Sequence, residues 1–170
     1  SAVCSVLLDQ SVEKVTGKGA GLTNKDLEHK IEVIRQSIAL NKVNADDPLD
    51  VLAKVGGLDI AGMAGCYIGG AALNIPVVID GFISSVAALI AIRLVPECAP
   101  YLFPSHCSNE PAGRMILDAI GKQPYIFANM CLGEGTGAVM GFTIADYAFK
   151  AYWVFPSFEQ TNFGTYEEFN

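Results

Sequence analysis

A short, β-branched apolar run limits the fold of this chain more than any other stretch. Residues 74–82 read Asn-Ile-Pro-Val-Val-Ile-Asp-Gly-Phe, and residues 77–79 are apolar without polar alternation. A strand that is apolar on both faces is typical of a parallel sheet, because helices cover both of its faces. Asp80-Gly81 predicts a turn at the end of the strand. The run therefore predicts an α/β fold.

Helical patterns lie on both sides of this strand. Residues 24–41 repeat apolar side chains at helical spacing, and Thr23 with Asp26 forms a capping-box pattern at the start. Asp47-Pro48 predicts the start of another helix that ends before Gly56-Gly57. Further helices are expected over residues 1–14, 58–73, 84–94, 112–120 and 138–153, and a second strand over residues 125–130. This order predicts a mostly parallel sheet flanked by helices, a Rossmann-like three-layer architecture.

The composition and net charge exclude several classes of protein and of partner. The 170 residues are 51% hydrophobic and 17% charged, with a mean hydropathy of +0.36, which excludes intrinsic disorder, collagen-like fibres and coiled coils. The net charge is -7 and no basic run is present, so nucleic acid is not an expected partner. The apolar stretch over residues 60–94 is interrupted by Asn74, Pro76 and Asp80, so no membrane span is expected.

The cysteines indicate the compartment. Five are present, an odd number, and none belongs to a Cys-x-x-Cys pair. In a chain of this size this pattern is typical of thiols in a reducing cytosol rather than of a disulfide framework. With only two histidines, no metal site is expected. We therefore expect a cytoplasmic protein.

A glycine-rich loop precedes the helix predicted from residue 24. Gly17, Gly19 and Gly21 alternate with other residues, and such a loop can present backbone N–H groups to an anion. Lys30, about two turns into the helix, could reach back as a positive charge. The loop lacks the Gly-Lys-Ser/Thr ending of a P-loop. Two interpretations remain open, an anion site and a plain tight turn, and spacing alone favours the turn.

A second glycine-rich segment follows the strand predicted over residues 125–130. Glu134 stands between Gly133 and Gly135, at the sheet edge where ligands bind in open α/β folds. Small neighbours allow a substrate to approach, so Glu134 is a candidate general base. The other interpretation is a glutamate that stabilises a helix N-terminus. The flanking glycines favour the catalytic interpretation.

Other polar residues are ambiguous. Asp80 either binds a ligand hydroxyl or forms the turn. His106 and Ser108 lie in an irregular segment with Glu110, but nothing there resembles a nucleophile elbow. We therefore interpret His106 as a structural or wall residue.

Taken together, the motifs resemble a known family. They lie at residues 15–22, 50–63, 76–82, 104–106 and 132–138. In this order they resemble nicotinate-nucleotide–dimethylbenzimidazole phosphoribosyltransferase from Ser1 to about Tyr152. The resemblance implies transfer of 5-phosphoribosyl from nicotinate mononucleotide to a benzimidazole nitrogen, giving α-ribazole 5′-phosphate for the lower loop of cobalamin.

The resemblance also implies roles for single residues. Glu134 matches the catalytic glutamate, which takes the benzimidazole N–H proton. The substrate-binding positions implied by the resemblance are Gly17, Gly19, Lys30, Asp80, Ser108, Gly133 and Gly135. No metal or other cofactor is expected, because the leaving pyridinium already carries a positive charge. The partners implied are the two small-molecule substrates and a second copy of the chain in a homodimer.

Two departures from the family keep an alternative open. Family members are much longer, so residues 1–153 correspond to the catalytic α/β domain of a C-terminal half, with residues 154–170 as a tail. Cys131 stands where many members have arginine. The chain is therefore expected to be this phosphoribosyltransferase or its catalytic half. The alternative is a non-catalytic nucleotide-binding or partner subunit of a split enzyme, and an unrelated α/β phosphate-binding protein is a third, weaker hypothesis.

Overall fold

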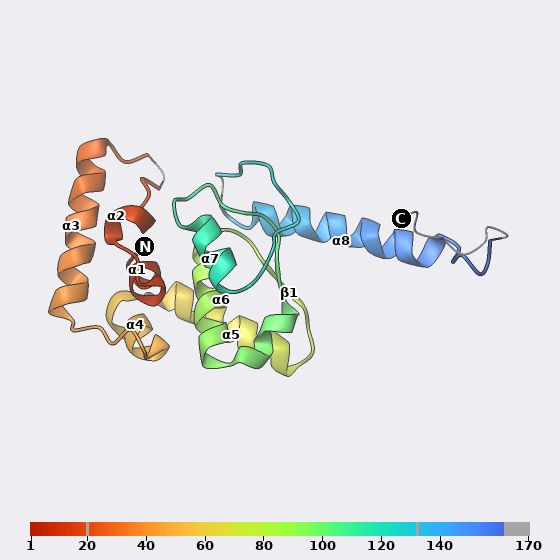
Figure 1. Ribbon diagram of the computed structural model, residues 1–170, viewed down its shortest axis with the longest axis horizontal. Coiled ribbons are helices and arrows are strands. Elements are labelled where there is room, and N and C mark those ends of the chain that lie inside the picture. The colour runs from red at the N-terminus through yellow and green to blue at the C-terminus, as the bar shows by residue number, and fades with distance from the viewer. Residues whose placement is uncertain (20, 132, 162–170) are drawn as a thin grey trace, which may run out of the picture.

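The described residues form a two-stranded parallel sheet, one strand of which is labelled in Figure 1. The computed structural model describes residues 1–19, 21–131 and 133–161. β1 (Val77–Ile79) pairs in parallel with β2 (Leu102–Pro104). Beyond β2, His106 forms a parallel bridge to Ile126, which brings a third segment alongside. The predicted α/β fold with a parallel sheet is confirmed.

The second strand does not lie where the sequence predicts it. Residues 125–130 contribute only the bridge at Ile126, so the strand prediction there is wrong. β2 comes instead from a segment that we interpreted as irregular, because prolines surround it and it is only three residues long. Leu102 is buried while Phe103 is partly exposed, and the Ser105 N–H continues the pairing by donating to the Ile79 carbonyl at 2.9 Å.

The sheet lies between helices that differ sharply in burial. Figure 1 shows β1 between α6 (Phe82–Leu94) and the long α8 (Thr136–Val154). α6 packs on α5 (Leu58–Ala72), and every residue from 85 to 91 is buried. Close packing on all sides makes α6 the centre of the core. The packing of β1 on α6 thus positions the carboxyl end of β1, where Asp80 follows.

The N-terminal third forms a separate layer of helices. It consists of α1 (Ala2–Leu8), α2 (Val12–Val15), α3 (Asn24–Leu40) and α4 (Pro48–Val55). The single helix predicted over residues 1–14 is wrong, because Asp9 adopts a left-handed conformation with φ 49° and ends α1. The capping box at Thr23 is confirmed, since the Asp26 N–H donates to the Thr23 hydroxyl at 3.2 Å.

The remaining elements complete the core. The 3₁₀ helix η1 (Pro96–Tyr101) leads into β2, and α7 (Gly113–Ala119) packs on α6. All five cysteines are free thiols. Burial raises the pKa of the Cys4 thiol to about 11, so this group is inert at neutral pH.

α8 extends away from the rest of the molecule (Figure 1). It ends at Val154, beside the predicted boundary between residues 1–153 and 154–170. Residues 162–170 lie outside the described part, so this domain division stays a prediction. Large apolar side chains from α8 and the segment after it are exposed: Val139, Met140, Phe142, Ile144, Tyr147, Phe149, Tyr152, Trp153, Val154, Phe155 and Phe158. Within the described ranges, no helix has the length and apolarity needed to cross a bilayer.

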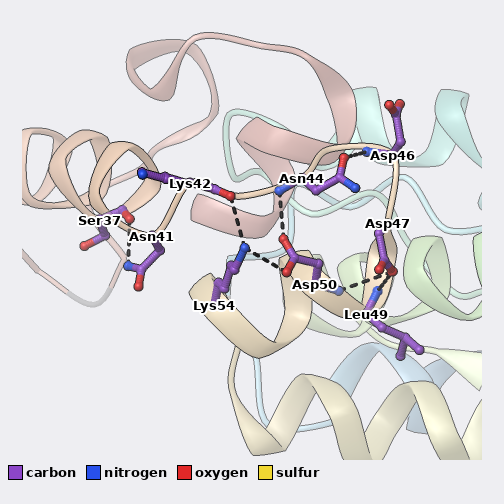
Figure 2. Close-up of polar contacts among 9 residues, drawn as sticks. All are labelled: Ser37, Asn41, Lys42, Asn44, Asp46, Asp47, Leu49, Asp50 and Lys54. Atoms are coloured by element: carbon purple, nitrogen blue, oxygen red, sulfur yellow. Dashed lines mark hydrogen bonds and ion pairs between the residues drawn. The ribbon is translucent and has the colours of Figure 1, made fainter.

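Asp47 provides a direct test of how local capping supports this fold. Its carboxylate accepts hydrogen bonds from the N–H groups of Leu49 at 2.9 Å and Asp50 at 3.3 Å (Figure 2). We expect Asp47→Ala to lower the free energy of unfolding by about 1 kcal/mol, measured by urea denaturation. The matched control is Asp46→Ala, which removes the adjacent exposed carboxylate but no cap. Equal stability of the two variants would contradict the assignment.

Candidate functional site

The carboxylate of Asp80 ties the end of β1 to the start of α8. Oδ2 accepts the Gly135 N–H at 3.2 Å, and Oδ1 accepts the Ala138 N–H at 3.0 Å. The first N–H groups of a helix have no partner within the helix, and a negative charge there is favourable. Gly135 is the N-cap residue and supplies no capping side chain. Asp80 therefore caps a helix whose own sequence provides no cap.

The buried His106 side chain packs against the first turn of α8. Its side chain is 2% exposed, and its Nδ1 lies 3.1 Å from the Ser105 hydroxyl oxygen. That hydroxyl donates to the Ile79 carbonyl at 2.8 Å. A Cβ atom on Gly137 would overlap the His106 ring and lie 2.9 Å from Asp80 Oδ1. Only glycine allows the first turn of α8 to approach the ring and the carboxylate this closely.

Glu134 lies just before this capped helix. Its side chain is exposed, and no ion pair found among the described residues includes it. Its backbone is left-handed, with φ 65°, and Gly135 follows with φ 79°. A left-handed conformation costs a residue with a side chain about 1–3 kcal/mol, so surrounding contacts must hold it. The carboxylate is thus presented to solvent at the sheet edge by a constrained turn.

Lys30 and the glycine loop form the second part of the candidate site. The Lys30 Nζ donates to the Gly17 carbonyl at 2.9 Å, so the lysine does reach back from α3 to the loop. Gly19 has φ 61°, a conformation that favours glycine, and a Cβ atom there would lie 4.0 Å from Lys30 Nζ. Gly17 is buried against Glu110, whose carboxylate occupies the space of any Cβ atom. Anion binding by this loop stays a prediction.

The loop of residues 108–111 connects the two parts. Glu110 contacts Gly17, and its N–H donates to the Ser108 hydroxyl at 3.3 Å. The Asn109 N–H donates to the Met130 carbonyl at 3.3 Å, a few residues before Glu134. The structure therefore links the glycine loop to the segment before Glu134 through residues 109 and 110. In Figure 1 both loops lie toward the upper edge of the view.

Sequence reasoning missed the structural use of Asn109, Glu110 and Tyr67. Asn109 and Glu110 stand beside Ser108 in a polar loop, which was the available signal. Nothing in the sequence around Tyr67 on α5 pointed to a role for it. Burial raises the pKa of Tyr67 to about 12; a hydrogen bond with Ser84 opposes this rise, and the negative charge of Asp80 adds to it. Its hydroxyl therefore stays protonated beside Asp80 at neutral pH.

The two best-formed surface depressions lie away from the predicted site residues. Two shallow depressions of about 330 and 380 Å³ lie over the N-terminal helices and α7. Neither is lined by a predicted site residue. In the described part of the chain, no three His, Cys, Asp or Glu side chains cluster as metal ligands.

The fold and these loops define an α/β protein with a candidate ligand site at the carboxyl edge of its sheet. A sequence profile described as phosphoribosyltransferase matches residues 1–163. The chain therefore belongs to this phosphoribosyltransferase family.

Individual relatives extend the comparison. A protein from Ruminiclostridium cellulolyticum is 53% identical over 152 residues, which are 89% of this chain and 43% of the relative. One from Acetivibrio thermocellus is 46% identical over 168 residues, covering 99% of this chain and 46% of the relative. Both are named nicotinate-nucleotide–dimethylbenzimidazole phosphoribosyltransferase. This chain thus spans less than half the length of these relatives.

Solved structures agree on the fold. A crystal structure of CobT from Thermus thermophilus superposes with a TM-score of 0.85 at 32% identity, covering 94% of this chain and 47% of that one. A second, of the nicotinate-nucleotide–dimethylbenzimidazole phosphoribosyltransferase from the same organism, gives 0.85 at 31% identity, with 96% and 48% covered. The Rossmann-like α/β architecture is therefore confirmed.

Gly137 tests the packing of the site. We expect Gly137→Ala to lower the free energy of unfolding by about 1–3 kcal/mol, because the new Cβ atom overlaps the His106 ring. Gly133→Ala is the matched control, since a Cβ atom there meets nothing within 4 Å. Thermal unfolding of both variants measures the difference. A Gly137→Ala variant as stable as its parent would show that α8 does not rest on His106.

Proposed function

We propose that this chain carries the catalytic glutamate of an enzyme that transfers 5-phosphoribosyl from nicotinate mononucleotide to 5,6-dimethylbenzimidazole. The products are α-ribazole 5′-phosphate and nicotinate, in the assembly of the cobalamin lower loop. Family membership and the names of the relatives support the reaction class. The observation that carries the proposal is an exposed Glu134 held in a left-handed turn at the sheet edge.

In this reaction Glu134 acts as a general base. One benzimidazole nitrogen attacks C1′ of the ribose, and the bond between C1′ and the nicotinate ring nitrogen breaks. The electron pair of that bond returns to the ring, which loses its positive charge on leaving. Glu134 accepts the proton of the other benzimidazole nitrogen, so the new base is neutral after transfer. Attack opposite the leaving group inverts the configuration at C1′.

The other predicted residues bind the nucleotide. Lys30 holds the 5′-phosphate as a point charge, together with backbone N–H groups of the loop around Gly17 and Gly19. Its hydrogen bond to the Gly17 carbonyl supports this role by placing the ammonium group at the loop. Gly133 and Gly135 form the wall beside the reacting carbon. The family resemblance places Asp80 and Ser108 near the site.

A second candidate function is a non-catalytic nucleotide-binding or partner subunit. The observation that favours it is coverage: the matched regions are 43% and 46% of the two relatives' lengths. In this case another polypeptide would supply the base pocket, and this chain would complete it. Activity of the chain alone separates the two candidates.

Glu134→Gln tests the proposed chemistry. In the complete protein that contains these residues, nicotinate release from nicotinate mononucleotide and 5,6-dimethylbenzimidazole is followed by chromatography. We expect Glu134→Gln to lower turnover by about a hundredfold or more, because the amide accepts no proton. Binding of nicotinate mononucleotide, measured by calorimetry, should be retained.

The control is Glu97→Gln, an exposed carboxylate on η1, which should leave turnover unchanged. Unchanged turnover in Glu134→Gln would remove the general-base assignment. If the 170-residue chain releases no nicotinate while a longer polypeptide that includes it does, the second candidate describes the isolated chain.

The proposal extends to assembly and compartment. The exposed apolar side chains of α8 support a homodimer, since a patch of this size is typical of an interface. Five free thiols support a cytoplasmic location. Sedimentation of the protein at micromolar concentration should give the mass of a dimer, and Trp153→Ser should shift it toward the monomer. A monomer at all concentrations would contradict the homodimer.

A further inference from the structure

The N-terminal cap of α8 comes from a distant part of the chain, whereas α3 and α4 supply their own caps. α3 begins with its own Thr23, and α4 begins with its own Asp47, both of which accept N–H groups of the same helix. α8 begins at a glycine, and its first N–H groups bind Asp80, a residue 55 positions earlier in the chain. The start of α8 is therefore located by the end of β1 rather than by local sequence.

The bond from Gly135 to Asp80 has a direct consequence for Glu134. The Gly135 N–H lies in the same rigid peptide plane as the Glu134 carbonyl. Holding this N–H against Asp80 Oδ2 therefore fixes the rotation of that plane. That plane also contains the Glu134 Cα–C bond, so the hydrogen bond restricts the direction of the Glu134 Cα–Cβ bond.

A second contact limits movement along the helix axis. Ala138, in the first turn of α8, donates to the other oxygen of Asp80, and Gly137 lies against the buried His106 ring. His106 is itself held by Ser105 and by its bridge to Ile126. These two hydrogen bonds and the packing of Gly137 on His106 thus join the first turn of α8 to the sheet edge.

We propose that Asp80 is a positioning residue that sets the location of the Glu134 carboxylate through the backbone of residues 134–138. This inference rests on the proposed role of Glu134 as general base. Both oxygens of Asp80 are engaged by α8, which distinguishes this role from direct binding of the ribose. Misplacement of a catalytic group by about 1 Å can lower a rate by about a hundredfold.

The experiment is a double-mutant cycle in the complete protein, with Asp80→Asn, Glu134→Gln and both together. Asparagine keeps the size of the side chain but replaces one acceptor oxygen by a donor, which faces an N–H group. We expect Asp80→Asn alone to lower kcat about 10- to 100-fold, with the Kd of nicotinate mononucleotide changed less than about twofold. In the Glu134→Gln background the same substitution should change kcat less than about twofold.

The outcomes separate the inference from the proposed function. An equal kcat loss from Asp80→Asn in both backgrounds would overturn the positioning role. A rise in Kd without a fall in kcat would also overturn it, because Asp80 would then be a substrate ligand. If Glu134→Gln alone has normal turnover, the proposed base fails first, and this is seen without reference to Asp80.

Two further variants guard against a fold effect. Ala138→Pro removes the N–H donor to Asp80 Oδ1 in the first turn of α8, and should also lower kcat with binding retained. Normal kcat in Ala138→Pro would contradict the inference even if Asp80→Asn did not fold. Asp47→Asn is the matched control: it alters the same kind of cap on α4 and should leave kcat unchanged.

Discussion

The structure depends on one carboxylate that joins a strand end to a distant helix. Asp80 follows the buried Ile79 directly, so its backbone is fixed by the sheet. Its two oxygens satisfy N–H groups that would otherwise face solvent at the start of α8. Because Gly137 carries no side chain, the helix can approach closely enough for both bonds, and Gly135 adopts the left-handed φ of 79° that precedes the helix. The position of Glu134 is a consequence of this junction.

The apolar side chains of this protein are buried in one long helix and exposed on another. α6 uses it for a core in which residues 85–91 are all buried. α8 instead exposes aromatic and aliphatic side chains along most of its length. Exposed apolar area of this extent is typical of an interaction surface rather than of an isolated monomer.

Local chemistry made parts of this fold predictable. Thr23 with Asp26, and Asp47 with Pro48, define helix starts within a few residues, and the structure confirms both. β2 was not predictable, because a three-residue strand surrounded by prolines is recognised only through its pairing with β1. Similarly, the interruption of the first helix at Asp9 depends on a single left-handed residue.

The candidate site likewise contains residues that the sequence identifies and contacts that only the structure shows. Glu134 and Lys30 stood out through glycine-rich neighbours and through the family resemblance. The bonds of Asp80 to α8 join residues 55 and 58 positions apart, and no periodicity or spacing reports such a pairing. His106 is buried, as a structural residue is expected to be, and its close approach to Gly137 is visible only in the folded backbone.

Amide hydrogen exchange of the isotopically labelled chain tests the junction most directly. The account predicts that the Gly135 and Ala138 amides exchange slowly and that Asp80→Asn speeds both at least about tenfold. The amides of Leu49 and Asp50, which bind Asp47, should be unaffected. Fast exchange of Gly135 and Ala138 in the parent chain, unchanged by the substitution, would contradict the claim that Asp80 holds the start of α8.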